Sequence, residues 1–199
     1  MITRVAIVIL FTILSGCELF TTRTPEDPAG SSGTYQQPTS ELIVISNFQN
    51  AVTEKNTENF ISCLSDSAKF GVKNFKFDPS SEIGARFSEQ FNTWSILSER
   101  QSFYSMMSKV TTDDKPSLQL SNARFDVRVP DSAVYVAEYI IKVNHSSPTI
   151  PKLAAGTLRL TIVPNQLNQW SISRWTDLKS TANDTIPSTW SELKVLFSN

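Results

Sequence analysis

The stretch FDVRVPDSAVYVAEYIIKV, residues 125–143, decides the fold of this chain. Its first five residues alternate between apolar and charged side chains, as in a strand with one buried face. Pro130-Asp131-Ser132 then has the composition of a hairpin turn. Residues 134–143 are rich in the β-branched and aromatic side chains that favour strands. The stretch therefore predicts two long antiparallel strands joined by a tight turn.

The alternating pattern continues on both sides of this hairpin. On the N-terminal side, residues 118–120 are out of phase with residues 125–129, so we predict a bulge near Asn122. On the C-terminal side, residues 158–162 and 170–175 alternate in the same way. Four successive strands with short connections predict an antiparallel meander.

Upstream of the meander, the apolar period changes to that of helices. Thr39 or Ser40 can cap a helix whose apolar stripe comprises Leu42, Ile45, Phe48, Ala51 and Val52. Thr57 is expected to cap a second, short helix, and a capping box at residues 98–101 is expected to open a third. A final helix should follow Pro187-Ser188, with its apolar side formed by Trp190, Leu193, Leu196 and Phe197.

Two segments between these helices are less regular. Residues 70–77 alternate loosely and favour a short extended segment, whereas residues 83–94 fit a helix and a loop equally well. The order is nevertheless helices first, then an antiparallel sheet, then a terminal helix. This order predicts an α+β fold with helices packed on one face of the sheet.

The composition fits a single folded domain. Hydrophobic residues make up 40% of the 199 residues, which suffices for a packed core. The formal net charge of the chain is −1, whereas nucleic-acid binding requires a basic face. We therefore expect no nucleic-acid partner.

The first seventeen residues have the layout of a secretory signal peptide. Arg4 supplies a positive charge, residues 5–14 are almost purely apolar, and Leu14-Ser15-Gly16-Cys17 follows. The closing tetrapeptide resembles the lipobox of bacterial lipoproteins, which implies cleavage before Cys17 and lipidation of that cysteine. An uncleaved N-terminal membrane helix, or a plain signal peptide with a chance cysteine, are the alternatives.

This interpretation divides the chain into three parts. Residues 1–16 are the signal peptide, residues 17–38 are the lipidated cysteine and a flexible tether rich in Pro, Gly and Ser, and residues 39–199 are the folded domain. The partner of Cys17 is then the lipid bilayer. Glu18 is not the aspartate that retains some lipoproteins in the inner membrane, so the resemblance implies a location in the bacterial cell envelope, on the outer membrane and facing the periplasm.

Four short phrases, taken in order, resemble the nuclear transport factor 2-like fold, also called the SnoaL-like or cystatin-like α+β cone. Residues 59–67 resemble the end of its second helix, residues 75–79 its first short strand and turn, and residues 170–177 its final strand. Residues 189–194 resemble a tail found in bacterial lipoproteins with this domain. The resemblance implies N-terminal helices over a strongly curved sheet, a short C-terminal helix, and a pocket between helices and sheet.

Enzymes of this fold place an acid–base pair in that pocket, and we searched for one. Glu138 lies in an apolar strand, where burial would raise the pKa of its carboxyl group. Its alternative role is a cross-strand ion pair with Arg128 or Arg159. Tyr104 and Asp78 are the other catalytic candidates, with core packing as the alternative for the tyrosine.

Three further features have a structural and a functional interpretation. Arg124, Asp126 and Arg128 share one face of a strand, where they are either solvated and paired across the sheet or turned into the pocket. His145 is the only histidine, and we expect it to lie exposed in a loop. Cys63 is expected to be a buried, inert thiol, with an intermolecular disulfide as the alternative.

These patterns favour a non-catalytic function. With one histidine and no Gly-rich phosphate loop, the chain offers no metal-ligand spacing and no cofactor motif, so we expect no metal and no cofactor. The prediction is an envelope lipoprotein whose domain has a binding or structural role. A small apolar ligand, an envelope protein and a second copy of the chain are its candidate partners. The alternative is a small-molecule isomerase or dehydratase.

Overall fold

The computed structural model describes residues 33–70, 73–180 and 185–198. The predicted signal peptide, the lipidation of Cys17 and most of the tether fall on residues 1–32, outside the described residues. Residues 32–199 form one compact unit. None of the helices in the described ranges is long and apolar enough to cross a membrane.

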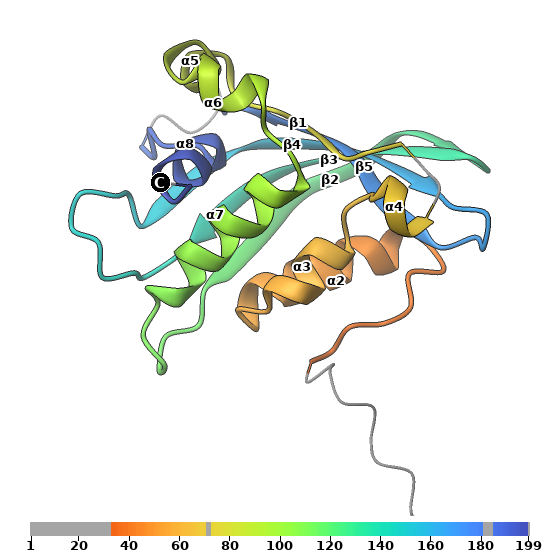
Figure 1. Cartoon of the computed structure of the whole chain (residues 1–199), viewed down its shortest axis with the longest axis horizontal. Coiled ribbons are helices and arrows are strands. Elements are labelled where there is room, and N and C mark those ends of the chain that lie inside the picture. Colours follow the sequence, from red (N-terminus) through yellow and green to blue (C-terminus); the bar gives the residue numbers. More distant parts are fainter. Residues whose placement is uncertain (1–32, 71–72, 181–184, 199) are drawn as a thin grey trace, which may run out of the picture. The chain divides into compact units, whose positions relative to one another are not determined.

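The centre of the domain is a curved five-stranded sheet. Its strands are β1 (Lys76–Asp78), β2 (Ser117–Val129), β3 (Ser132–Lys142), β4 (Leu153–Pro164) and β5 (Trp170–Leu178). They are arranged in the order β1-β5-β4-β3-β2 (Figure 1). Strands β2 to β5 form the predicted antiparallel meander. The expectation of a purely antiparallel sheet is wrong at one edge, because β1 pairs in parallel with β5.

Bulges give the sheet its curvature. The predicted bulge in β2 is confirmed, because the register with β3 shifts between Ser121 and Arg124 and Asn122 has a φ of 50°. Two further shifts, which the sequence pattern did not reveal, lie between Phe125 and Val127 of β2 in its pairing with β3 and between Thr161 and Ile162 of β4 in its pairing with β5. An extra residue on one strand increases the local twist and bends the sheet. Consequently both Ile172 and Trp175 of β5 face the helices, although three positions separate them.

Seven helices are described. They are α2 (Glu41–Thr53), α3 (Thr57–Ser62), α4 (Ser67–Phe70), α5 (Ser81–Arg86), α6 (Ser88–Asn92), α7 (Ile96–Ser108) and α8 (Trp190–Leu196). The longer helices α2 and α7, together with α3 and α8, lie against one face of the sheet (Figure 1). The α+β layout predicted from the sequence is therefore confirmed.

The local capping residues differ in part from those expected. Ser40 caps α2 as predicted, but the side chain of Asn56, not that of Thr57, accepts from the backbone at the start of α3, at Asn59 N (3.0 Å). The capping box of α7 joins Ser95 and Ser98, so this helix begins three residues before the predicted box. In both helices the cap is an upstream residue, Asn56 or Ser95, whose side-chain oxygen reaches the free N–H groups of the first turn.

Three segments correct or complete the sequence prediction. Leu42 is exposed and Val44 takes its place in the core. Residues 67–70 form a short helix, so only residues 76–78 of the expected extended segment are a strand, and Val72 lies outside the described residues. The ambiguous segment 83–94 lies mostly in helices α5 and α6.

Aromatic side chains fill the space between helices and sheet. Phe48 of α2 stacks on Phe60 of α3, and Phe60 stacks on Phe103 of α7 with ring centroids 3.9 Å apart. Trp175 of β5 meets Trp190 of α8 edge to face at 4.7 Å. Each such ring buries a large apolar area, so this cluster ties all four helices to the sheet.

Candidate functional site

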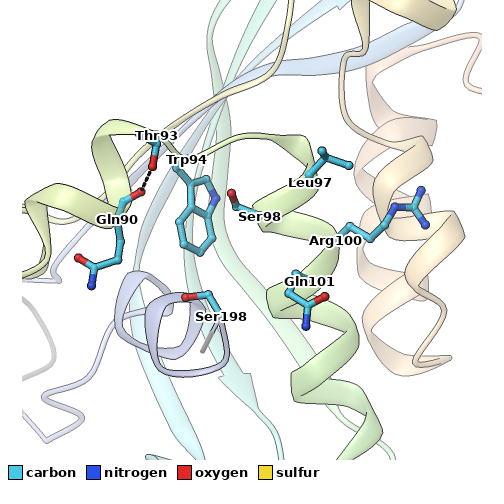
Figure 2. A pocket seen from close by; sticks show the side chains of 8 residues that line it. All are labelled: Gln90, Thr93, Trp94, Leu97, Ser98, Arg100, Gln101 and Ser198. Carbon is cyan, nitrogen blue, oxygen red and sulfur yellow. Dashed lines mark hydrogen bonds between the residues drawn. The ribbon is translucent and has the colours of Figure 1, made fainter.

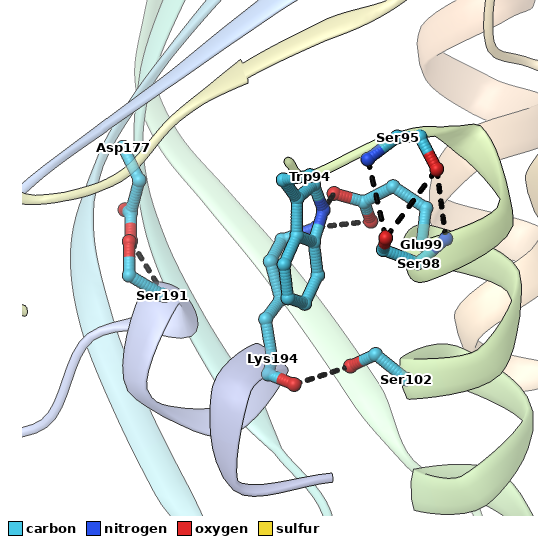
Figure 3. Close-up of polar contacts among 8 residues, drawn as sticks. All are labelled: Trp94, Ser95, Ser98, Glu99, Ser102, Asp177, Ser191 and Lys194. Carbon is cyan, nitrogen blue, oxygen red and sulfur yellow. Dashed lines mark hydrogen bonds and ion pairs between the residues drawn. The ribbon is translucent and has the colours of Figure 1, made fainter. Parts of the chain in front are cut away.

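A buried polar network lies where the fold would place a pocket, between the sheet and α8. The hydroxyl of Tyr139 donates to Asp177 Oδ1 at 2.7 Å and accepts from the backbone N–H of Trp190 at 2.7 Å. Ser191 donates to Asp177 Oδ2 through both its backbone N–H and its hydroxyl (Figure 3). The Asp177 carboxylate therefore accepts three hydrogen bonds. Two of them come from Ser191, the second residue of α8.

A second group of side chains joins α8 to α7. Lys194 of α8 forms an ion pair with Glu99 of α7, and Trp94 donates its indole N–H to the other oxygen of Glu99 at 2.8 Å (Figure 3). Lys194 also lies over the ring of Trp175, with its nitrogen 3.8 Å from the ring centroid. The Ser102 hydroxyl donates to the carbonyl of Lys194 at 2.8 Å.

Burial dominates the electrostatics of this network. It raises the pKa of Asp177, against the opposing effect of hydrogen bonds from Ser191 and Tyr139 and of the charge on Lys194. It also lowers the pKa of Lys194, against the opposing effect of Glu99. Burial and the neighbouring Asp177 place the pKa of Tyr139 well above its ordinary value. Burial removes water from the Asp177–Tyr139 and Glu99–Lys194 pairs, which is unfavourable for their charges. The hydrogen bonds within each pair offset part of this desolvation penalty.

The network has the residue types of an acid–base site but not its geometry. Tyr139, Asp177, Glu99 and Lys194 are each at most 2% exposed. Their polar atoms are already engaged with one another and with the N-terminal part of α8. A catalytic group must reach the proton that it transfers within hydrogen-bond distance. In this conformation the four side chains are buried and bonded to one another, and they can hold α8 in place.

Sequence reasoning missed Glu99, Asp177 and Lys194, although the helical spacing contains a signal for two of them. Lys194 follows Trp190 by four positions, and Glu99 precedes Phe103 by four, so each charge lies on the apolar side of its own helix. A charged residue on an apolar stripe implies a buried partner. Asp177 carries no such signal, because the bulge opposite Thr161 and Ile162 changes the phase of its strand.

The three catalytic candidates from the sequence are far from forming a common site. Glu138 pairs in register with Ser121 and Thr157, on the sheet face opposite to that of Tyr139. Tyr104 is 62% exposed on α7. Asp78 ends β1, where its carboxylate accepts from Arg174 and from Thr176. The structure thus places these residues on three separate surfaces.

The carboxylate of Asp78 is held in its charged form. Partial burial alone would raise its pKa, but the hydrogen bond and charge of Arg174, together with Thr176 and Lys76, lower the pKa overall. A carboxylate that stays ionised is a poor proton donor near neutral pH. The contacts of Asp78 with Arg174 and Thr176 join the edge strand β1 to β5.

The charged residues of β2 pair with one another, with β4 and with α2, and leave Glu138 without a charged partner among the described residues. Asp126 accepts from Arg124 at 3.0 Å and from Arg159 of β4 at 2.8 Å. Arg128 forms a two-pronged contact with Glu41 at the start of α2 (3.2 and 3.3 Å). The prediction of exposed, cross-strand charges is confirmed for Asp126, which pairs with Arg159 of β4, whereas Arg128 pairs with helix α2. The predicted pair between Glu138 and either Arg128 or Arg159 is wrong.

His145 differs from the expectation of an exposed loop residue. It is 2% exposed, because its ring packs edge to face on Phe197 and its Nε2 lies 3.0 Å from the carbonyl oxygen of Pro151. The loop after β3 folds back against the end of α7, where His145 forms a bridge with Val110. Cys63 is buried, as predicted, and its thiol donates to the Asn59 carbonyl at 3.2 Å.

Open grooves lie on the outside of the domain. One of about 550 Å³ runs along α6 and α7 and is called the α6–α7 groove here (Figure 2); its lining residues are Gln90, Thr93, Trp94, Leu97, Ser98, Arg100, Gln101 and Ser198. Another of about 640 Å³ lies between the α2–α3 turn and α7. Neither is lined by Tyr139 or Asp177. Across the described ranges, no cluster of His, Cys, Asp or Glu side chains could hold a metal ion.

The chain enters the domain along α2. The Glu54 carboxylate accepts from the backbone N–H and the hydroxyl of Thr34, each at 2.8 Å. The side chain of Asn47 exchanges two hydrogen bonds with the backbone of Gln36 (2.9 and 2.6 Å). Ordered contacts therefore begin before Thr39, within the segment that the sequence assigned to the tether.

Comparison with known proteins supports the fold. No family model and no curated protein matches the sequence. Among solved structures, two proteins from Novosphingobium aromaticivorans are similar. One, whose assignment as a scytalone dehydratase is unconfirmed, has a TM-score of 0.51 and 10% identity over 69% of this chain and 80% of its own. The other, whose assignment as an aromatic ring hydroxylase is unconfirmed, has a TM-score of 0.50 and 13% identity over 72% and 88%.

A third similar structure is described as belonging to the nuclear transport factor 2-like family. It comes from Streptomyces avermitilis, its assignment as a dehydratase is unconfirmed, and it has a TM-score of 0.49 with 12% identity over 69% of this chain and 91% of its own. At identities this low, structural likeness speaks to the fold and not to the activity. Helices packed on a curved, mixed sheet give this chain an α+β fold, which it shares with the two Novosphingobium structures.

Proposed function

We propose that this chain is a bacterial envelope lipoprotein, anchored through acyl chains on Cys17, whose domain has a non-catalytic binding or structural role. The observation that carries the non-catalytic part is the burial of the polar network between α8, α7 and the sheet. The polar side chains that could perform acid–base chemistry, among them Asp177 and Lys194, are enclosed and bonded to one another.

Energetic reasoning also supports a structural role for the enclosed charges. A buried ion is stable only where partners replace its lost hydration. Glu99 has two such partners, Lys194 and Trp94, and Asp177 has Tyr139 and both donors of Ser191. Opening the pocket for a substrate would require these contacts to break together, whereas a binding or structural domain needs no such opening.

The anchoring part of the proposal is supported by the sequence of residues 4–17. Each buried CH₂ group of an acyl chain contributes about 0.8 kcal/mol to membrane binding, and one chain alone holds only marginally. The lipobox resemblance implies two acyl chains in a diacylglyceryl group on the sulfur of Cys17 and a third on its amino group. Three chains together would suffice for stable attachment. The resemblance and Glu18 together favour the outer membrane, facing the periplasm.

Lysine reactivity tests whether the cone is closed. A small amine-reactive reagent should modify the exposed Lys142 and Lys152 of the folded protein, while Lys194 stays protected until the protein unfolds. Mass spectrometry after a short exposure measures both. Modification of Lys194 at the rate of the exposed lysines would contradict a closed, non-catalytic domain.

Metabolic labelling with palmitate tests the anchor. The wild-type chain should incorporate label and fractionate with membranes, whereas the Cys17→Ser variant should do neither. The Cys63→Ser variant is the matched control, because Cys63 lies inside the folded domain and should not affect labelling. Equal labelling of the Cys17→Ser variant would exclude this anchor.

A further inference from the structure

The α6–α7 groove differs from the buried network around α8 because it is open and faces outward, and it shares only Trp94 with that network. Its volume of about 550 Å³ lies within the range of small-molecule sites. The groove contains an aromatic residue, an exposed leucine and several amide and hydroxyl groups (Figure 2). The question is which class of ligand this combination would bind.

Trp94 forms a fixed apolar surface in the groove. Its indole N–H points inward and donates to Glu99 at 2.8 Å, and its ring packs on Phe91 with centroids 5.0 Å apart. The ring is therefore held in one orientation without any ligand. A rigid aromatic surface costs little conformational entropy on binding. Leu97 of α7, which is 71% exposed, adds a second apolar side chain to the lining of the groove.

Two amide side chains lie on either side of this surface. Figure 2 shows Gln90 on one side of Trp94 and Gln101 on the other. Both are exposed, and the described part of the chain provides no hydrogen-bond partner for either side chain. An amide group offers two donors and one acceptor. The pair can therefore both donate to and accept from hydroxyl groups of a ligand above the ring.

The charge of the groove argues against a strongly ionic ligand. Among the described residues that line the groove, only Arg100 is charged, and its guanidinium group is already paired with Glu58. A phosphorylated or highly acidic ligand would need unpaired cations. A cationic ligand would need a carboxylate at the groove, and the lining residues include none.

We propose that the α6–α7 groove binds a neutral saccharide. The C–H groups on the face of a pyranose ring carry partial positive charge and pack on the negative face of an aromatic ring. The hydroxyl or acetamido groups at the ring edge exchange hydrogen bonds with amides such as Gln90 and Gln101. This inference rests on the proposal that the domain has a binding role, and it adds the class of ligand and the place where the ligand binds.

Saturation-transfer NMR tests the proposal on the full-length protein in a phosphocholine detergent, which carries no sugar. The probes are chitotetraose and maltotetraose, with a neutral tetrapeptide as the competing class. We expect at least one saccharide to bind with a Kd of about 0.1–10 mM, as suits an open groove. The Gln90→Ala/Gln101→Ala double variant should raise that Kd about tenfold.

A matched control separates this site from others. The Gln119→Ala/Gln166→Ala variant removes two exposed amides outside the groove and should bind as the wild type does. No saturation transfer from either saccharide, equal binding by both double variants, or binding of the tetrapeptide alone would overturn the proposal. Each of these results would leave the protection of Lys194 unchanged, so the two proposals fail separately.

Discussion

Lys194 and Glu99 form an ion pair that bridges α8 and α7, with neither side chain more than 2% exposed. Each charge is also satisfied from a second direction, Glu99 by the indole of Trp94 and Lys194 by the face of Trp175. The pair and its aromatic neighbours hold α8 against α7 and β5. These contacts make the meeting point of α7 and α8 a buried structural joint.

Breaking this pair from one side should be costly. The Lys194→Met variant keeps much of the side-chain volume but leaves the Glu99 carboxylate buried without its counter-ion. Removing one partner of a buried pair typically destabilises by about 3–5 kcal/mol. Urea unfolding followed by circular dichroism should show a loss of this size.

The double variant is the decisive control for the pair. Glu99→Gln/Lys194→Met removes both charges while the glutamine oxygen still accepts from Trp94. Because replacing both charges removes the desolvation penalty as well, it should recover more than half of the lost free energy. A double variant as unstable as Lys194→Met alone would mean that packing, and not charge, dominates at this joint.

The hydroxyl of Tyr139 should contribute a second measurable part of the stability. It links Asp177 to the backbone of Trp190, so Tyr139→Phe leaves one buried acceptor and one buried donor short of a partner. The expected loss is about 1–3 kcal/mol in the free energy of unfolding. Tyr104→Phe is the control, because that hydroxyl is on an exposed ring, and it should change the stability by less than about 0.5 kcal/mol. Equal effects of the two substitutions would argue against the network.

Much of the fold was predictable because its signals are local. The alternation over residues 118–143 gave the strands, and even the bulge at Asn122 follows from a change of phase within the β2 sequence. The parallel strand β1 was not predictable in the same way. It has only three residues, and its pairing with β5 joins positions almost a hundred residues apart.

The site was predictable only in part, because burial of a charge depends on partners distant in sequence. Lys194 and Glu99 each lie on an apolar helical stripe, but their meeting requires α8 to return to α7 after the whole sheet has formed. The exposure of His145 was mispredicted because its burial also depends on a residue distant in sequence. Its Ser-rich and Pro-rich neighbourhood is typical of an exposed loop, yet Phe197 at the far end of the chain covers it.

The stability of the domain should fall in acid partly through Asp78. Its folded-state pKa is lowered by Arg174 despite partial burial, so the unfolded chain binds a proton at Asp78 more readily than the folded chain does. The stabilisation is therefore fully present above the ordinary aspartate pKa of about 3.9 and is lost as the pH falls through the lower folded-state value. Asp78→Asn removes this titration.

Thermal melts at two pH values measure this effect. The difference in Tm between wild type and Asp78→Asn should be largest near neutral pH and should shrink at about pH 3. Asp113→Asn, in the exposed loop after α7, should show no comparable change in its difference from the wild type. A difference for Asp78→Asn that stays constant or grows in acid would mean that its ion pair with Arg174 contributes nothing to stability.

Cys63 should be chemically silent in the folded protein. Burial raises the pKa of its thiol, and the thiolate is the reactive form. The side chain is 2% exposed at the end of α3 and donates to Asn59. A thiol reagent should therefore modify it only during opening of the domain, at least about 100-fold more slowly than a cysteine introduced at the exposed Thr112. Rapid modification, or a disulfide-linked dimer of the native protein that disappears in Cys63→Ser, would show that the thiol reaches solvent and would favour intermolecular pairing instead.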